Sequence, residues 1–239
     1  MSWFGFGGGS KVDKHVKKLT NAYAQTHDRI RSLEQLCDIG TDEALYGICQ
    51  RFTYRTEASI VDEDEKELAY KFLVAAGPAV IAPIKRFVAE KDAVYWPIKA
   101  LRDVAGMDAA VDVLLDILDR SESFSGRVNE KKHQIVSNLR DFHHPKVLAR
   151  LQALIADGDE EVRIMAMDGL MTYGEDEAKP YAARLLLDAE ESPRVKMVLL
   201  EQLIEHQWSL ADWRTQFEEQ DLLPFPYRVG ASGICERVS

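Results

Sequence analysis

Residues that could bind a metal ion or attack a substrate are scattered along the chain. Of the six histidines only His143 and His144 are adjacent, and neighbouring imidazoles in a turn do not easily reach one tetrahedral ion with correct geometry. The three cysteines form no Cys-x-x-Cys pair, a usage typical of a reducing compartment. Neither residue type therefore predicts a metal site.

The patterns of phosphate binding and nucleophilic catalysis are also missing. The three glycines at 7–9 precede no lysine–serine pair, so they do not form a P-loop. No Gly-x-Ser-x-Gly nucleophile elbow occurs. We therefore predict a protein that is not an enzyme and that has no catalytic residue, resident metal or cofactor.

One pattern of basic and apolar residues recurs through most of the chain. Its clearest copy places a basic residue at Arg163, apolar residues at Ala166 and Leu170, and a helix stop at Gly174. Residues spaced by three and four lie on one helical face, and the last position suits a left-handed cap. The same slots recur at Arg29/Ser32/Leu36/Gly40, Lys66/Ala69/Leu73/Gly77, Lys132/Ile135/Leu139/His143 and Lys196/Leu199/Leu203/Gln207.

A second apolar stripe of helical period follows each stop, and the repeat length of about 33 residues is typical of stacked helix pairs. We predict an all-α fold, a curved α-solenoid of about six antiparallel helix pairs with an N-terminal capping helix and an extended C-terminal tail. No sheet is expected. The expected pairs are 27–53, 62–90, 93–119, 129–155, 159–187 and 193–220, after a capping helix at about 11–25. The expected starts of helices include Thr41, Asp62, Asp159 and Ser192.

The segment 159–174 resembles HEAT repeats of the bilin-lyase-like (PBS-lyase HEAT) type, whose unit reads Asp-x-x-Val-Arg-x-x-Ala-x-x-x-Leu-x-x-x-Gly. The resemblance extends over roughly residues 27–220. It implies an α-solenoid but indicates little about activity, because lyases, scaffolds and regulators all contain this repeat. We interpret the chain as a non-catalytic protein–protein interaction scaffold, adaptor or regulatory subunit. A bilin or other prosthetic-group lyase remains an alternative, as does a nucleic-acid-binding HEAT-like protein.

The charge distribution bears on these alternatives. The net charge is −10, yet residues 1–19 contain four lysines and one aspartate, so the rest of the chain is strongly acidic and would repel a phosphate backbone. Nucleic acid is therefore an unlikely partner. No apolar run is long enough to span a membrane and residues 1–10 have no basic start, so we predict a cytoplasmic protein without a transmembrane segment.

Partner binding is expected on the second helices, because the resemblance places them along the inner surface of the solenoid. Their outward slots combine aromatic, basic and acidic groups, as a recognition surface would. The expected inner-groove residues are Tyr46, Gln50, Lys85, Arg86, Asp112, Asp116, Tyr181 and Arg184. The repeated basic residue of the first helices is instead expected to pair with an acidic residue near the adjoining turn.

The expected domain organisation is a flexible leader at 1–10, a single HEAT-like repeat domain at 11–220 and an extended tail at 221–239. Trp3, Phe4 and Phe6 lie in the leader before four lysines. They could form a hook that contacts a membrane surface or a partner's pocket, or a dispensable end. The tail contains Pro224 and Pro226, which exclude a helix; it either caps the last repeat or reaches into a partner.

Overall fold

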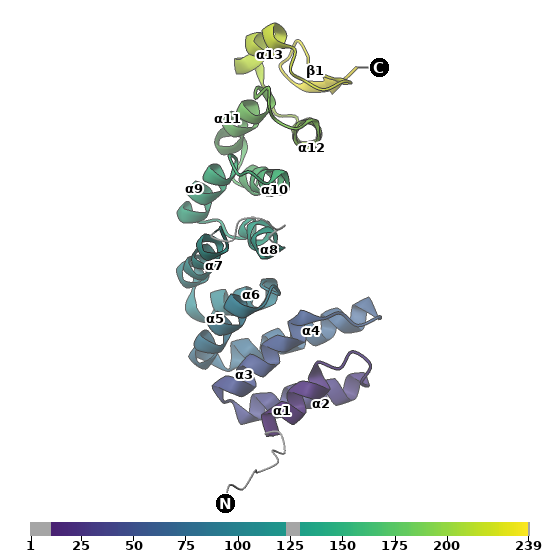
Figure 1. Cartoon of the computed structure of the whole chain (residues 1–239), viewed down its shortest axis with the longest axis vertical. Coiled ribbons are helices and arrows are strands. Elements are labelled where there is room, and N and C mark those ends of the chain that lie inside the picture. The colour runs from purple at the N-terminus through teal and green to yellow at the C-terminus, as the bar shows by residue number, and fades with distance from the viewer. Residues whose placement is uncertain (1–10, 123–129, 239) are drawn as a thin grey trace, which may run out of the picture. The chain divides into compact units, whose positions relative to one another are not determined.

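The computed structural model describes residues 11–122 and 130–238 (Figure 1). The chain divides into two compact units, residues 1–123 and 124–239. The described residues are overwhelmingly α-helical, as predicted. Trp3, Phe4 and Phe6 lie outside the described residues.

The first unit is built from a single helix followed by three helix pairs. The first helices of the pairs pack on one another, and the second helices form a neighbouring row. Its helices are α1 (Lys11–Leu19), α2 (Thr26–Ile39), α3 (Asp42–Cys49), α4 (Ser59–Ala75), α5 (Ile81–Glu90), α6 (Tyr95–Ala105) and α7 (Met107–Glu122), with short 3₁₀ turns at Gln50–Thr53 and Gly77–Val80.

The second unit continues the same alternation. Its α10 lies between α8 and α12 in one row of helices and also packs against α9 and α11 of the neighbouring row. Its helices are α8 (Glu130–Leu139), α9 (Pro145–Leu154), α10 (Glu160–Met171), α11 (Glu175–Leu186), α12 (Pro193–His206) and α13 (Arg214–Gln220), with a 3₁₀ turn at Ala211–Trp213. The predicted pairs are thus confirmed to within a few residues, whereas the capping helix ends at Leu19 rather than near residue 25.

Three of the four predicted helix starts are confirmed. Thr41, Asp159 and Ser192 accept hydrogen bonds from backbone N–H groups at the starts of α3, α10 and α12. The expectation that Asp62 begins a helix is wrong. Helix α4 already begins at Ser59, and the Asp62 side chain is buried instead, where it accepts a hydrogen bond from Arg51.

The glycine stops take the positive φ values that glycine allows, +62° at Gly40 and at Gly77. Gln207 substitutes for glycine at the end of α12 with φ 55°. The prediction that His143 does the same is wrong, since it is not among the described residues with positive φ. Helix α8 ends at Leu139, and the N–H of Phe142 closes the turn by donating to the Leu139 carbonyl at 3.0 Å.

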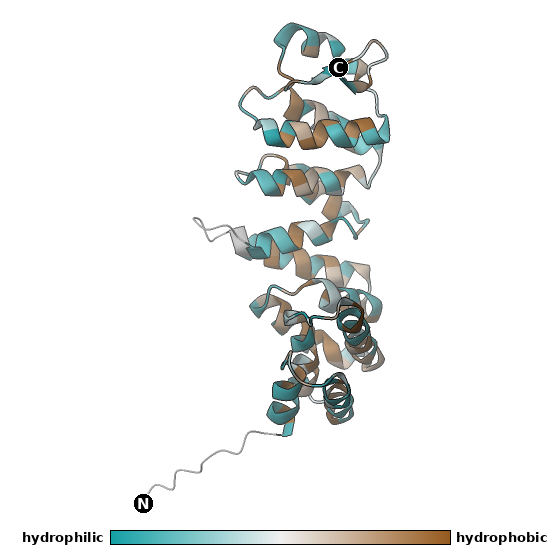
Figure 2. Cartoon of the chain, turned by 90° about the vertical axis from the view of Figure 1, so that its right-hand side faces the viewer, coloured by the Kyte–Doolittle hydropathy of each residue, from teal (hydrophilic) through white to brown (hydrophobic). Residues whose placement is uncertain are grey.

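The core of each unit consists of the apolar face of every helix. Leu36, Leu73 and Leu101, on three successive first helices, are fully buried, and so is Leu170 in the second unit. Hydrophobic and hydrophilic residues accordingly share most helices (Figure 2). No single helix among the described residues is long and apolar enough to span a membrane; α4 and the segment 77–90 pass that test only together, with a bend of 117° between them.

The tail departs from the expectation of a fold without any sheet. After Pro226, β1 (Tyr227–Val229) pairs antiparallel with β2 (Cys235–Arg237), and Tyr227 faces Arg237 in the register. The hairpin packs on α12, where Arg237 pairs with Glu201 at 2.5 Å and Cys235 is buried. The tail therefore covers one side of α12, the last of the first helices. The sequence did not indicate this strand pairing because each strand has only three residues.

Leu170 tests the packing of the second unit. We expect Leu170→Ala to lower the free energy of unfolding by roughly 2–4 kcal/mol, because removal of this fully buried side chain would leave a cavity. Met197→Ala is the matched control on α12, where the side chain is 39% exposed, and should cost about 0.5 kcal/mol at most. Urea unfolding followed by circular dichroism measures both, and equal costs would contradict this packing.

Candidate partner-binding surfaces

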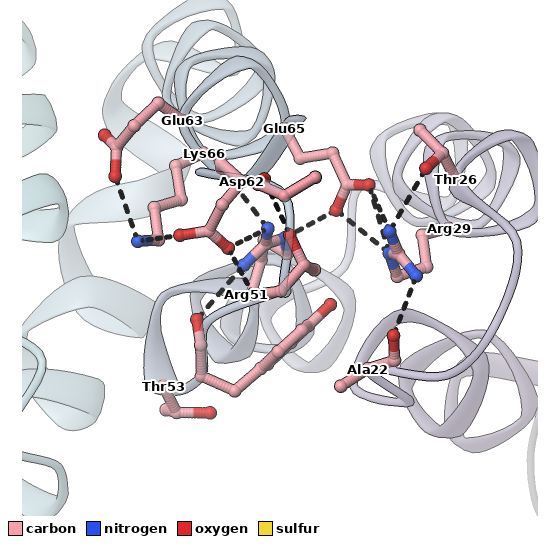
Figure 3. A network of polar contacts seen from close by, with 12 residues as sticks. Ala22, Thr26, Arg29, Arg51, Thr53, Asp62, Glu63, Glu65 and Lys66 are labelled. Atoms are coloured by element: carbon pink, nitrogen blue, oxygen red, sulfur yellow. Dashed lines mark hydrogen bonds and ion pairs between the residues drawn. The ribbon is translucent and has the colours of Figure 1, made fainter. Parts of the chain in front are cut away.

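A buried network of charges joins α2, α4 and the 3₁₀ turn after α3 in the first unit (Figure 3). Arg29 Nη2 lies 2.7 Å from Glu65 Oε1, and Arg51 Nε lies 2.8 Å from the other oxygen of the same carboxylate. Arg51 also reaches Asp62 at 2.8 Å. Glu65 therefore receives hydrogen bonds from two guanidinium groups that come from different helices.

This network is closed to solvent and to ligands. Arg51 has no exposed surface, and Glu65 is 1% exposed. Lys66 lies 2.5 Å from Asp62, so every charge of the cluster has an opposite partner. Burial raises the pKa of Asp62, but hydrogen bonds from Lys66 and Arg51 outweigh that effect and lower it to about 2. The Asp62 carboxyl group therefore stays ionised at neutral pH. The buried cluster is a structural element and not a binding site.

The predicted pairing of the repeated basic residues with an acidic residue near the adjoining turn is confirmed at Lys132 and Arg163. Arg29 pairs instead with Glu65 inside α4, and Lys66 pairs with Asp62 and Glu63 on its own helix. In the second unit, Lys132 pairs with Asp157 and Arg163 pairs with Glu191 at 2.6 Å. Lys196 differs, because it donates to the carbonyl of Leu222 in the tail at 3.2 Å. The contacts of Lys132, Arg163 and Lys196 each link a first helix to the following turn or to the tail.

Of the predicted binding residues, Tyr46 and Arg86 form a preorganised cluster on α3 and α5. The Arg86 guanidinium lies 4.1 Å from the centre of the Tyr46 ring, and both its terminal nitrogens bond to Glu43, at 3.0 and 2.9 Å. Tyr46 donates to Glu90 Oε2 at 2.6 Å. Burial, followed by the Glu90 bond and its charge, raises the pKa of Tyr46 to about 12, so its hydroxyl remains a donor.

The other predicted residues of the first unit are less organised. Lys85 is exposed beside Arg86 on α5, and Gln50 is half-buried at the 3₁₀ turn after α3. Asp112 and Asp116 are exposed on α7, where Asp116 pairs with Arg120 at 2.7 Å. The chemistry of a recognition surface is thus concentrated at Tyr46, Arg86 and their two glutamates.

In the second unit, α11 contributes the half-buried Tyr181 and the exposed Arg184. Arg184 lines a depression of about 310 Å³ together with Asp157, Asp188 and Glu190. Arg163 and Glu191, which pair with each other, also line this depression, so its lining is mainly charged. Tyr181 and Arg184 belong to a separate unit from Tyr46 and Arg86, and each pair is a surface of its own.

The row of first helices in the first unit carries a surface that sequence reasoning missed. Between α2 and α4 lies a depression of about 400 Å³ whose apolar lining comes from Ile30, Val61 and Leu68. Ile60, next to it in sequence, is 78% exposed. The sequence signal that could have indicated this surface was Ile60, a large apolar residue within the acidic start of a helix.

Between α4 and α6 the same row presents an aromatic cluster. Trp96 packs against Tyr70 and Tyr95 with ring centres 5.7 and 5.4 Å apart. Lys99 Nζ lies 5.0 Å from the rings of both Tyr70 and Trp96, and Tyr70 is bonded to Asp103. Tyrosine and tryptophan are enriched at protein interfaces.

No metal-binding cluster of three or more histidine, cysteine or acidic side chains occurs in the ranges 11–122 and 130–238. The cysteines are not linked in disulfides. Burial raises the pKa of the Cys235 thiol to about 11 and raises that of Cys49 as well, so these thiols remain protonated at neutral pH.

Comparison with known families identifies the helix pairs in part of the chain. A sequence model of HEAT repeats matches residues 111–204, from α7 into α12. This stretch therefore belongs to the HEAT-repeat family, and the helix pairs before it share its alternation; the bilin-lyase-like subtype stays a prediction. No curated protein and no solved structure matches the chain.

Asp62 provides a test of the buried network through pH. Its folded-state pKa of about 2 lies below the ordinary value of about 3.9, so its contribution to stability is present above pH 4 and is lost as the pH falls toward 2. We expect Asp62→Asn to be less stable at pH 7 and to lose less stability than the wild type between about pH 5 and pH 3.

The control for this experiment is Asp64→Asn, an exposed position on the same helix, which should retain the wild-type pH profile. Free energies of unfolding from urea titrations at each pH give the comparison. An Asp62→Asn variant whose stability falls with acid as steeply as that of the wild type would contradict the assignment.

Proposed function

We propose that this chain is a non-catalytic, cytoplasmic protein–protein interaction scaffold, adaptor or regulatory subunit. HEAT repeats are generally protein-interaction scaffolds, and residues 111–204 match them. In a stack of helix pairs, each pair buries only the faces that contact its neighbours. Long outer rows of side chains therefore remain accessible to partners. Three unlinked cysteines suit the reducing cytoplasm.

The observation that carries the proposal within this chain is the Tyr46–Arg86 cluster. A tyrosine and an arginine stack at the surface and are fixed by Glu43 and Glu90, so a partner that binds them would lose little side-chain entropy. Tyrosine and arginine are among the residues that most often dominate binding energy. The proposed binding residues are those expected from the sequence: Tyr46, Gln50, Lys85, Arg86, Asp112, Asp116, Tyr181 and Arg184.

The partner and its surface can be tested together. Affinity purification of the tagged chain from its own cells, followed by mass spectrometry, should recover a specific protein partner. The triple variant Tyr46→Ala/Arg86→Ala/Tyr181→Ala should reduce that recovery about tenfold or more, because hot-spot truncations cost enough binding energy for such a loss. Circular dichroism and thermal melting should stay close to wild type, since these side chains are exposed or half-buried.

A second triple variant, Ile60→Ala/Tyr95→Ala/Lys99→Ala, removes side chains from the row of first helices and serves as the comparison. It should leave recovery unchanged. Loss of the partner from this variant alone would move binding to the first helices. A wild-type chain that recovers no protein above background would contradict the scaffold function itself.

A further inference from the structure

The first helices of the first unit leave an apolar area open to solvent. It is the depression of about 400 Å³ between α2 and α4, whose apolar lining comes from Ile30, Val61 and Leu68. Each of these three side chains is only half-buried, so part of its apolar surface remains in contact with water. The depression is therefore an opening between two neighbouring first helices and not a cavity of the core.

Two strongly exposed apolar side chains flank this depression. Tyr23, which is 92% exposed, lies in the loop before α2, three residues before the lining residue Thr26. Ile60, which is 78% exposed, lies on α4 beside the lining residue Val61. Single exposed apolar residues need no explanation, whereas apolar residues gathered around a depression are typical of an interaction site.

The buried charge network holds the two sides of the depression in place. Arg29 bonds to Glu65, which also lines the depression from α4. The same guanidinium donates to the carbonyls of Ala22 and Ala24, on either side of Tyr23. One side chain thus fixes the loop before α2 relative to α4. A surface that is fixed before binding loses little conformational freedom when a partner binds.

The charged side chains that line the depression leave one carboxylate without a cation. Glu65 is bound by two buried arginines, and Glu67 pairs with Lys71 at 2.8 Å. The exposed side chain of Asp64 makes no ion pair or hydrogen bond with the residues that the structure describes. The uncompensated charge at this surface is therefore negative, and it favours a lysine or arginine on the partner.

We propose that the depression between α2 and α4 binds a short segment of a partner protein that carries apolar side chains beside a lysine or arginine. One apolar side chain of the segment enters the depression, and its apolar neighbours pack on Tyr23 and Ile60. The basic side chain pairs with Asp64 at the rim. An apolar anchor in a recess with charged contacts around it is the usual arrangement of a binding hot spot.

The same charge distribution decides against other classes of partner. Asp64 and the net charge of −10 repel a nucleic-acid backbone and an anionic bilayer. A protein segment can present apolar and basic side chains together, which is the combination that this surface complements.

This site is separate from the proposed Tyr46–Arg86 surface. It lies on the row of first helices, whereas Tyr46 and Arg86 lie on α3 and α5 of the neighbouring row. The segment bound here belongs to a different partner, so Ile60 contributes to this site and not to the binding at Tyr46 and Arg86. Each proposal is tested by removing different side chains, and either can fail without the other.

Selection of displayed peptides on the full chain, followed by fluorescence anisotropy of the most enriched peptide, tests the proposal. We expect the enriched peptides to share apolar residues next to a lysine or arginine, and their binding to weaken as salt rises. The variant Tyr23→Ser/Ile60→Ser should weaken binding about tenfold or more, because it removes apolar contacts at the rim. Asp64→Lys should also weaken it about tenfold, because like charges then meet.

Matched control variants make the same kinds of change in the second unit. Met197→Ser/Phe225→Ser removes two exposed apolar side chains, and Glu205→Lys reverses an exposed charge on α12. Both controls should bind the peptide as the wild type does, and so should Tyr46→Ala/Arg86→Ala. Circular dichroism should show the same helicity in all these variants, because the altered side chains are exposed or half-buried.

Three results would overturn the proposal. The first is that no peptide is enriched, or that the enriched peptides lack basic residues. The second is that the Tyr23→Ser/Ile60→Ser variant or the Asp64→Lys variant binds the peptide as tightly as the wild type. The third is a wild-type chain that self-associates in sedimentation equilibrium and becomes monomeric in the Tyr23→Ser/Ile60→Ser variant, because a second copy would then occupy the depression.

Discussion

The fold depends on charged contacts that tie one repeat to the next. Arg29 on α2 bonds to Glu65 on α4, and Arg163 on α10 bonds to Glu191 just before α12. A side chain from the first turn of one first helix thus meets a carboxylate of the following repeat. Buried ion pairs of this kind add little net stability compared with apolar packing, but an unpaired member is costly. They therefore fix the register between neighbouring helix pairs.

Because buried contacts link neighbouring repeats, the exposed side chains of the helix rows can differ from one repeat to the next. The second helices carry the Tyr46–Arg86 cluster, and the first helices carry the apolar depression at Ile30 and the aromatic cluster at Trp96. The α1 lysines add a surface of opposite charge to most of the chain. An α-solenoid with chemically distinct surfaces can contact more than one kind of partner.

The sequence predicted the helix pairs because a period near 3.6 and glycine stops are local signals. Gly40 and Gly77 ended their helices as expected, whereas His143 did not, since a three-residue turn closed α8 without a left-handed residue. The structural role of the basic row was predictable from its repetition. The partner of each basic residue was not predictable, because Lys196 donates to a carbonyl of the tail whereas Arg163 pairs with a glutamate.

The surfaces were harder to predict than the helices. The cation–π contact of Tyr46 with Arg86 joins two helices whose relative rotation the sequence does not specify. The aromatic cluster around Trp96 similarly depends on how α4 meets α6. Short strands such as β1 lack the length for an alternating pattern, so the hairpin on α12 also required the structure.

A double-mutant cycle on Arg163 and Glu191 tests the central claim most directly. The two single variants to alanine and the double variant, compared by urea unfolding, yield the coupling energy of a contact that is 2.6 Å long and largely buried. We expect a favourable coupling of about 1–3 kcal/mol, clearly larger than that of the exposed pair Arg194 and Glu160. A coupling no larger than that of the exposed pair would show that the repeats are held together without these contacts.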